Sequence, residues 1–208
     1  MLPEVTDYCR LILIRHPQLH ESVANVAVGA GHAELSRRGK QRAIEWIELL
    51  KETEIDVVLA SDQPQSSQPA AAFARDRGLE VGQDERLRDQ DMGRWQGRDW
   101  EEVLAEDPVE VKQFFEHFGE TVPPEGESLV QAVDRILGWW KEVADSAAGK
   151  TFAVVTAGSV IAGFAGAMLG MRLSRCMSLS LPHGGVGVID VFANGVRLSA
   201  WSVDSLAR

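Results

Sequence analysis

The 208-residue sequence has only two cysteines, Cys9 and Cys176, and neither belongs to a Cys-x-x-Cys pair or a Cys/His cluster. Their separation excludes a disulfide framework and gives no support to a zinc site, so we expect no metal and no cofactor. Positive charge is also scarce, because 21 Lys and Arg face 31 Asp and Glu, for a net charge of -10. This balance argues against nonspecific binding of nucleic acid or of an anionic membrane.

Long hydrophobic runs are missing as well. The longest apolar stretch, residues 151–170, is interrupted by glycines and is better interpreted as a buried strand that leads into a buried helix. The first residues lack the basic start and apolar segment of a signal peptide. With 45% hydrophobic residues and no linker-like segment, the sequence predicts one cytoplasmic domain spanning residues 1–208.

Short aliphatic runs and helical spacing alternate along the chain. The expected strands are Cys9–Ile14, Ile55–Ala60, Leu79–Val81, Thr151–Thr156, Val186–Phe192 and Val196–Trp201, the last two joined by a hairpin turn at 193–195. The expected helices are Arg37–Glu52, Pro69–Arg77, Trp100–Glu106, Val109–Phe118, Ser128–Ala147 and Ser159–Leu169. Ser36 is the expected cap of the first helix, and the apolar spacing there assigns Ala43, Ile44, Ile47, Leu50 and, less regularly, Trp46 to its buried face.

This alternation predicts a three-layer α/β/α fold with a mostly parallel sheet and one antiparallel edge. A less regular helical and loop insert is expected at about residues 87–126. In such folds the ligand crevice lies beyond the carboxyl ends of the strands. The residues to examine therefore follow the strands at 15–17, 61–63 and 156–158.

Five segments carry a resemblance to a known family. They are Leu13-Ile14-Arg15-His16, residues 35–43 (LSRRGKQRA), residues 87–97 (LRDQDMGRWQG), Gly126-Glu127-Ser128 and residues 154–158 (VVTAG). In this order and spacing they resemble the signatures of the histidine phosphatase superfamily, the phosphoglycerate-mutase-like proteins. The resemblance spans Leu11 to about Trp201 and implies the phosphoglycerate-mutase-like fold.

The resemblance implies phosphoryl transfer through a phosphohistidine. His16 would be the nucleophile and Arg15 a phosphate clamp, while a carboxylic acid at the position of Asp89 would protonate the leaving oxygen. In the family, a second arginine and a second histidine also hold the phosphoryl oxygens.

Four positions depart from that pattern. The second arginine falls on Gln65 and the second histidine on Ala157. The acid is Asp89 instead of glutamate, one methylene shorter, and the glycine after the nucleophile is Pro17, which has no backbone N–H. An engineered change explains Ala157 alone, but natural divergence accounts better for all four.

Removing one preorganised donor costs ~10²–10³ in rate. We therefore expect a catalytically impaired or inactive phosphatase that serves as a binding or regulatory module, with a small phosphorylated or anionic ligand or a protein as its partner. The alternative is a slow phosphomonoesterase that works through phospho-His16, or another chemistry in the same crevice. Arg15, Gln65, Ala157 and His183 are the candidate ligand-binding residues.

Several of these residues also have a purely structural interpretation. His16 could be a hydrogen-bonded residue at a sheet end, and His183 is expected in a turn, with the role of substitute phosphate ligand as the less favoured alternative. Packing is the favoured role of Trp95 and Trp100 over lining a pocket. The remaining assignments are solvated positions for His20, His32 and His117, and a helix start for Glu127 and Ser128. Asp91 is expected to be a loop cap or a solvated charge, with a paired acid beside Asp89 as the less favoured alternative.

Overall fold

One six-stranded sheet organises the molecule, whose computed structural model describes residues 8–117 and 119–202. The strand order is β3-β2-β4-β1-β5-β6. The strands are β1 Tyr8–Arg15, β2 Val57–Ala60, β3 Val81–Gln83, β4 Thr151–Thr156, β5 Val186–Phe192 and β6 Gly195–Trp201. Strands β1 to β4 pair in parallel, whereas β5 runs antiparallel to both β1 and β6. The α/β prediction is confirmed, and the hairpin of β5 and β6 forms the predicted antiparallel edge.

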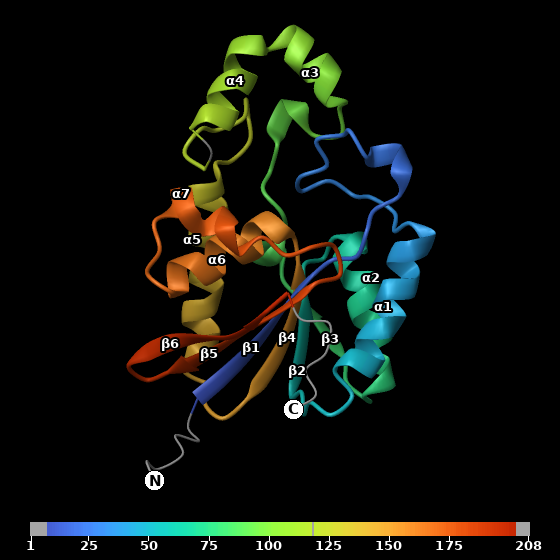
Figure 1. The fold of residues 1–208 in the computed structure, drawn as a ribbon, viewed down its shortest axis with the longest axis vertical. Coiled ribbons are helices and arrows are strands. Elements are labelled where there is room, and N and C mark those ends of the chain that lie inside the picture. The colour runs from blue at the N-terminus through green and yellow to red at the C-terminus, as the bar shows by residue number, and fades with distance from the viewer. Residues whose placement is uncertain (1–7, 118, 203–208) are drawn as a thin grey trace.

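Helices cover both faces of the sheet, because the central strand β1 is apolar on both sides (Figure 1). Leu11 and Leu13 face the layer of α5 (Leu129–Ala144) and α6 (Gly158–Met168). Ile12 and Ile14 face the opposite layer, which contains α1 (Arg37–Leu49) and α2 (Pro64–Asp76). The uninterrupted aliphatic run of β1 therefore produces three layers, since successive side chains point to opposite faces.

Helix α1 begins where the sequence predicts. The Ser36 hydroxyl accepts a hydrogen bond from the backbone N–H of Gly39, which satisfies a donor that the helix itself leaves free. The predicted core position of Ile44 is wrong, because this side chain is 60% exposed. Trp46 is fully buried, and its indole N–H donates to the carbonyl of Gly184 at 3.0 Å. The buried face of α1 therefore includes Trp46, which contacts the loop that precedes β5.

Helix α2 begins at Pro64, five residues before the predicted start at Pro69. Proline suits the first helical position, because the N–H that it lacks has no helical partner there. Pro69 lies inside the helix. The early start places Gln65 in the first turn, where it is 2% exposed.

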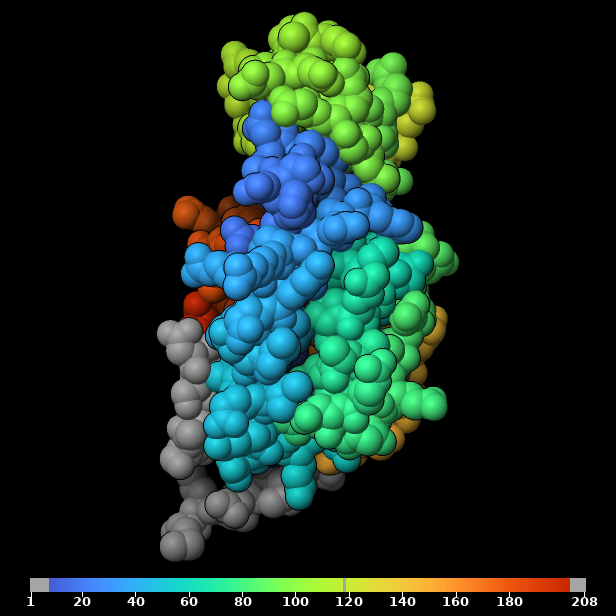
Figure 2. Space-filling model, turned by 90° about the vertical axis from the view of Figure 1, so that its right-hand side faces the viewer, coloured from blue at the N-terminus to red at the C-terminus, as the bar shows by residue number. Residues whose placement is uncertain are grey.

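The segment after β3 forms a separate cluster beyond the carboxyl end of the sheet, at the top of Figures 1 and 2. Its helices are α3 (Trp100–Glu106) and α4 (Pro108–Glu116), and the predicted end of the second helix at Phe118 lies outside the described residues. Trp95, Trp100 and Phe114 pack against one another, with the Trp95 and Phe114 ring centroids 5.5 Å apart. The favoured packing role of both tryptophans is confirmed.

The shorter elements are 3-10 turns at Glu21–Val23, Glu85–Leu87, Gly93–Trp95 and Met177–Leu179, and helix α7 at Leu173–Cys176. Within residues 8–117 and 119–202, no single helix is long and apolar enough to cross a bilayer. Only a pair of consecutive helical segments, Gly158–Met168 and Leu173–Leu179, reaches that length and hydropathy together, and the two are bent by 119° relative to each other.

Candidate active site

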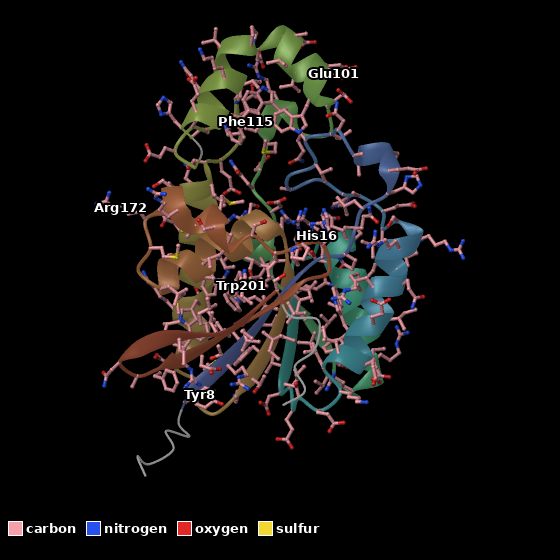
Figure 3. The ribbon with its side chains drawn as sticks, in the orientation of Figure 1. Tyr8, His16, Glu101, Phe115, Arg172 and Trp201 are labelled. Atoms are coloured by element: carbon pink, nitrogen blue, oxygen red, sulfur yellow. The ribbon has the colours of Figure 1, made fainter. Side chains whose placement is uncertain are left out.

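The candidate site lies at the carboxyl ends of β1, β2 and β4. Figure 3 shows His16 at this end of the sheet, on the side that faces α3 and α4. The backbone N–H of His16 donates to the carbonyl of Thr156 at 2.9 Å, which extends the pairing of β1 with β4 beyond the last strand residue. The sheet thus fixes the backbone of the predicted nucleophile.

His16 is buried, with 6% of its surface exposed. Its Nδ1 lies 3.0 Å from the carbonyl oxygen of Pro17, an acceptor, so Nδ1 carries the proton and Nε2 keeps a free lone pair. Burial, reinforced by the nearby charge of Arg15, lowers the pKa of His16 to about 4, against the opposing effect of the Pro17 hydrogen bond. The ring is therefore neutral at physiological pH. Pro17 has lost its N–H, but its carbonyl still orients the imidazole.

The Arg15 guanidinium lies between the start of α6 and the loop before β5. Nη1 donates to the carbonyl of Leu181 at 2.7 Å, and Nη2 lies 3.0 Å from Nε2 of His183. A Cβ atom added to Gly158 would lie 2.8 Å from Arg15 Nε, so a larger residue there would displace the guanidinium from this position. Arg15 Nε is buried and has no hydrogen-bond partner within residues 8–117 and 119–202. A buried, unpaired guanidinium N–H is a potential anion contact.

His183 belongs to the turn before β5, as predicted, and also reaches the site. Its ring centroid lies 5.3 Å from that of His16. Burial, together with the nearby Arg15 and the neighbouring His16, lowers the pKa of His183 to about 4. At neutral pH this ring therefore adds no positive charge beside His16.

Asp89 lies in the insert, next to the start of α6. Its Oδ1 accepts hydrogen bonds from the Ser159 hydroxyl at 2.6 Å and from the backbone N–H of Gln90 at 2.8 Å. Burial raises the pKa of Asp89 despite these hydrogen bonds and the nearby charges of Arg135 and Arg15. A carboxyl that keeps its proton to a higher pH is suited to proton donation.

The Gln65 side chain is hydrogen-bonded to the loop at residues 31–33. Its Nε2 donates to the carbonyl of Gly31 at 2.9 Å, and its Oε1 accepts from the backbone N–H of Ala33 at 3.2 Å. Gln63 strengthens this attachment, since its Nε2 donates to the carbonyls of Gly29 and Gly31 and its Oε1 accepts from the N–H of Asp89. Both ends of the Gln65 amide are thus engaged by residues 29–33.

Ala157 is 3% exposed and is the residue before the first turn of α6, where it makes no side-chain capping bond. The structure therefore brings together Arg15, His16 and His183, and places Asp89 within electrostatic range of Arg15. At the position of the family's second arginine the chain has the Gln65 amide, which is hydrogen-bonded to a loop. At the position of the second histidine it has only the methyl group of Ala157.

The residues with expected structural roles largely fill them. His20 caps the 3-10 turn at 21–23, Asp91 accepts from the N–H of Gly93, and Ser128 forms a capping box with Gln131. Glu127 forms an ion pair with Arg135. His32 and His117 are exposed.

Three features of the site were missed from the sequence. Ser159 follows Ala157 by two residues and gave a helix-start signal, but nothing indicated that it reaches a residue 70 positions away. Gln63 stood among the residues after β2, without an assigned role. The carbonyl of Pro17 could have been considered, because proline loses its N–H and keeps its acceptor.

Comparison with known proteins agrees with this geometry. The histidine phosphatase superfamily (branch 1) model matches residues 11–204. Phosphoserine phosphatase 1 of Hydrogenobacter thermophilus is 28% identical, with 88% of this chain and 86% of that protein covered. Phosphoglycerate mutase 1 of Saccharomyces cerevisiae is also 28% identical, with 84% of each covered.

Solved structures show the same fold. The α-ribazole phosphatase from Shigella flexneri superposes with a TM-score of 0.88 at 20% identity, covering 96% of this chain and 98% of that one. Mycobacterial glucosyl-3-phosphoglycerate phosphatase gives a TM-score of 0.84 at 23% identity, covering 95% and 100%. With a family model that matches almost its whole length and a strand-end histidine in the expected place, the chain belongs to the histidine phosphatase superfamily.

Proposed function

We propose that the chain binds a small phosphorylated or similarly anionic molecule at Arg15 and His16, as a binding or regulatory module, and turns it over much more slowly than a family member with the complete set of cationic groups. The observation that carries this proposal is that the Gln65 side chain is hydrogen-bonded to a neighbouring loop. Its amide is bound to residues 29–33 at both ends, so the position of the second arginine supplies no positive charge, and one of its two N–H donors is already used by that loop.

Binding is supported by the unsatisfied donors of Arg15. Its guanidinium has five N–H groups, and its hydrogen bonds to Leu181 and His183 use one on each Nη atom. The buried Nε–H would gain a partner from an anion beside His16. Charge-assisted hydrogen bonds of this kind contribute about 1.5–3 kcal/mol each.

Slow turnover is supported by the charge around His16. A phosphoryl group in transfer carries negative charge on three equatorial oxygens, and catalysis depends mainly on holding that charge. Near His16, Arg15 is cationic, while His183 and His16 itself are neutral at pH 7. Gln65 and Ala157 add no positive charge.

A slow phosphomonoesterase is the second candidate, and the state of His16 and Asp89 favours it. His16 is neutral with Nε2 free to attack phosphorus, and Asp89 has a raised pKa suited to protonating the leaving oxygen. The relatives named above are phosphatases and a mutase. Turnover through His16 would fall as the pH drops through about 4, because protonation removes the lone pair of Nε2.

Calorimetric titration with orthophosphate at pH 7 tests the binding proposal. We expect one site per chain, and we expect Arg15→Ala to weaken the affinity at least about tenfold, since one lost charge-assisted hydrogen bond already costs about 1.5 kcal/mol. Arg37→Ala is the matched control, because Arg37 is an exposed arginine on α1. Unaltered affinity in a folded Arg15→Ala variant, or the same loss in both variants, would rule out this site.

A further inference from the structure

The loop before β5 is fastened to the end of β1 by its backbone. The N–H of Arg15 donates to the carbonyl of Gly185 at 3.0 Å, and the N–H of Gly184 donates to the carbonyl of Arg15 at 3.1 Å. Gly184 has a φ of +73°, which side-chain-bearing residues rarely adopt. This geometry places His183, the residue before it, beside the Arg15 side chain.

The contact between these two side chains has one chemically consistent arrangement. Guanidinium has no acceptor and does not lose its proton, so Arg15 Nη2 donates and His183 Nε2 accepts. The imidazole proton must then reside on Nδ1, which faces the carbonyl oxygen of His16 at a longer distance of 3.4 Å. His183 is thus neutral, with its Nε2 lone pair directed at Arg15.

This arrangement disfavours direct phosphate binding by His183. Binding an anion requires a donor or a positive charge, whereas Nε2 presents a lone pair, and partial desolvation together with the charge of Arg15 lowers the pKa of the ring and favours its neutral form. The ring also reaches solvent, because it lines a surface cavity of about 500 Å³. The other lining residues are Gln18, Arg38, Gln41, Arg42, Glu45 and Pro182.

We propose that His183 is a positioning residue that holds the Arg15 guanidinium ready for an anion beside His16. The inference rests on the anion binding proposed above. Two acceptors on the same loop, the Leu181 carbonyl and His183 Nε2, hold one Nη atom each. A free arginine side chain loses considerable rotamer entropy when it binds, and a side chain that is already held loses less.

The tautomer of His183 tests this inference without any ligand. Two-bond ¹H–¹⁵N spectra of the imidazoles at pH 7 should show His183 protonated on Nδ1. In Arg15→Ala the acceptor role disappears, so a large share of Nε2-protonated ring should appear. An Nε2-protonated His183 in the wild-type chain would overturn the inference, because such a ring cannot accept from Arg15.

Two amide substitutions test the functional consequence, with orthophosphate as the probe. The glutamine amide reaches the position of Nε2, whereas the asparagine amide reaches only that of Nδ1. We expect His183→Gln to keep the wild-type affinity and His183→Asn to bind orthophosphate roughly three- to tenfold more weakly, as a side chain that must be ordered on binding would. A simple packing role would affect both variants alike.

The outcomes separate this inference from the proposed function. If the wild-type chain does not bind orthophosphate, the proposed function fails, while the tautomer still decides the role of His183. If the wild-type chain binds and both amide variants match it, or both lose affinity equally, the positioning role is wrong. Arg15→Ala combined with His183→Asn should bind no more weakly than Arg15→Ala alone, because His183 acts through Arg15.

Discussion

The double variant Gln65→Arg/Ala157→His should hydrolyse p-nitrophenyl phosphate at least about 100-fold faster than the wild-type chain. Each substitution restores a group that holds charge on the phosphoryl oxygens, and one such group is worth ~10²–10³ in rate. The two effects are not expected to multiply fully, because groups that act as a unit are not additive. His16 is already neutral and oriented, so it needs no change.

The matched control is Gln68→Arg/Ala72→His. It introduces the same two side chains on α2 at positions that are exposed to solvent. This control should leave the rate unchanged. The restored variant loses the hydrogen bonds of Gln65 to residues 29–33, so its melting temperature must be measured alongside. A folded variant with no gain in rate would show that these two positions do not limit catalysis.

Gly93→Ala should lower the free energy of unfolding by roughly 3 kcal/mol or more, the largest stability effect that we predict. Gly93 has a φ of +53°, and a Cβ atom there would lie 2.1 Å from the carbonyl oxygen of Pro124 and 2.5 Å from the backbone nitrogen of Gly126. Both are backbone atoms, which cannot rotate away. The turn at 91–93 and the loop at 124–126 would have to separate.

Gly97→Ala separates the steric clash from the backbone strain. Gly97 also has a positive φ, of +78°, but a Cβ atom there meets nothing within 4 Å. Its substitution should cost only the strain, about 1–2 kcal/mol. Urea unfolding of the wild-type chain and both variants measures the difference. Equal losses in the two variants would mean that the close approach at Gly93 has no energetic weight.

The central strands were predictable because burial on both faces leaves a direct mark on the sequence. The run ending at Ile14 is aliphatic at successive positions, and its alternate residues fill two different cores. Helix α2 was harder, since its first turn consists of Pro, Gln and Ser, which also occur in loops. Ile44 was misplaced because spacing alone does not say that Trp46 turns toward the loop before β5.

The site residues were likewise predictable in part. Arg15 and His16 could be found because they end a recognisable strand. The contact of His183 with Arg15 depends on a loop 168 residues away, whose course is set by hydrogen bonds and by Gly184. Likewise, the sequence marked Gln65 as a lost arginine, but not that its amide holds residues 29–33.

Hydrolysis of p-nitrophenyl phosphate by the wild-type chain and by His16→Ala, measured as kcat/KM from pH 4 to pH 8, tests the proposed loss of catalysis most directly. If Gln65 and Ala157 have removed most of the phosphoryl-transfer machinery, the wild-type rate will stay well within about 100-fold of the His16→Ala rate. A wild-type rate about 100-fold or more above that of a folded His16→Ala variant would contradict the account, because it would show that Arg15, His16 and Asp89 suffice for catalysis.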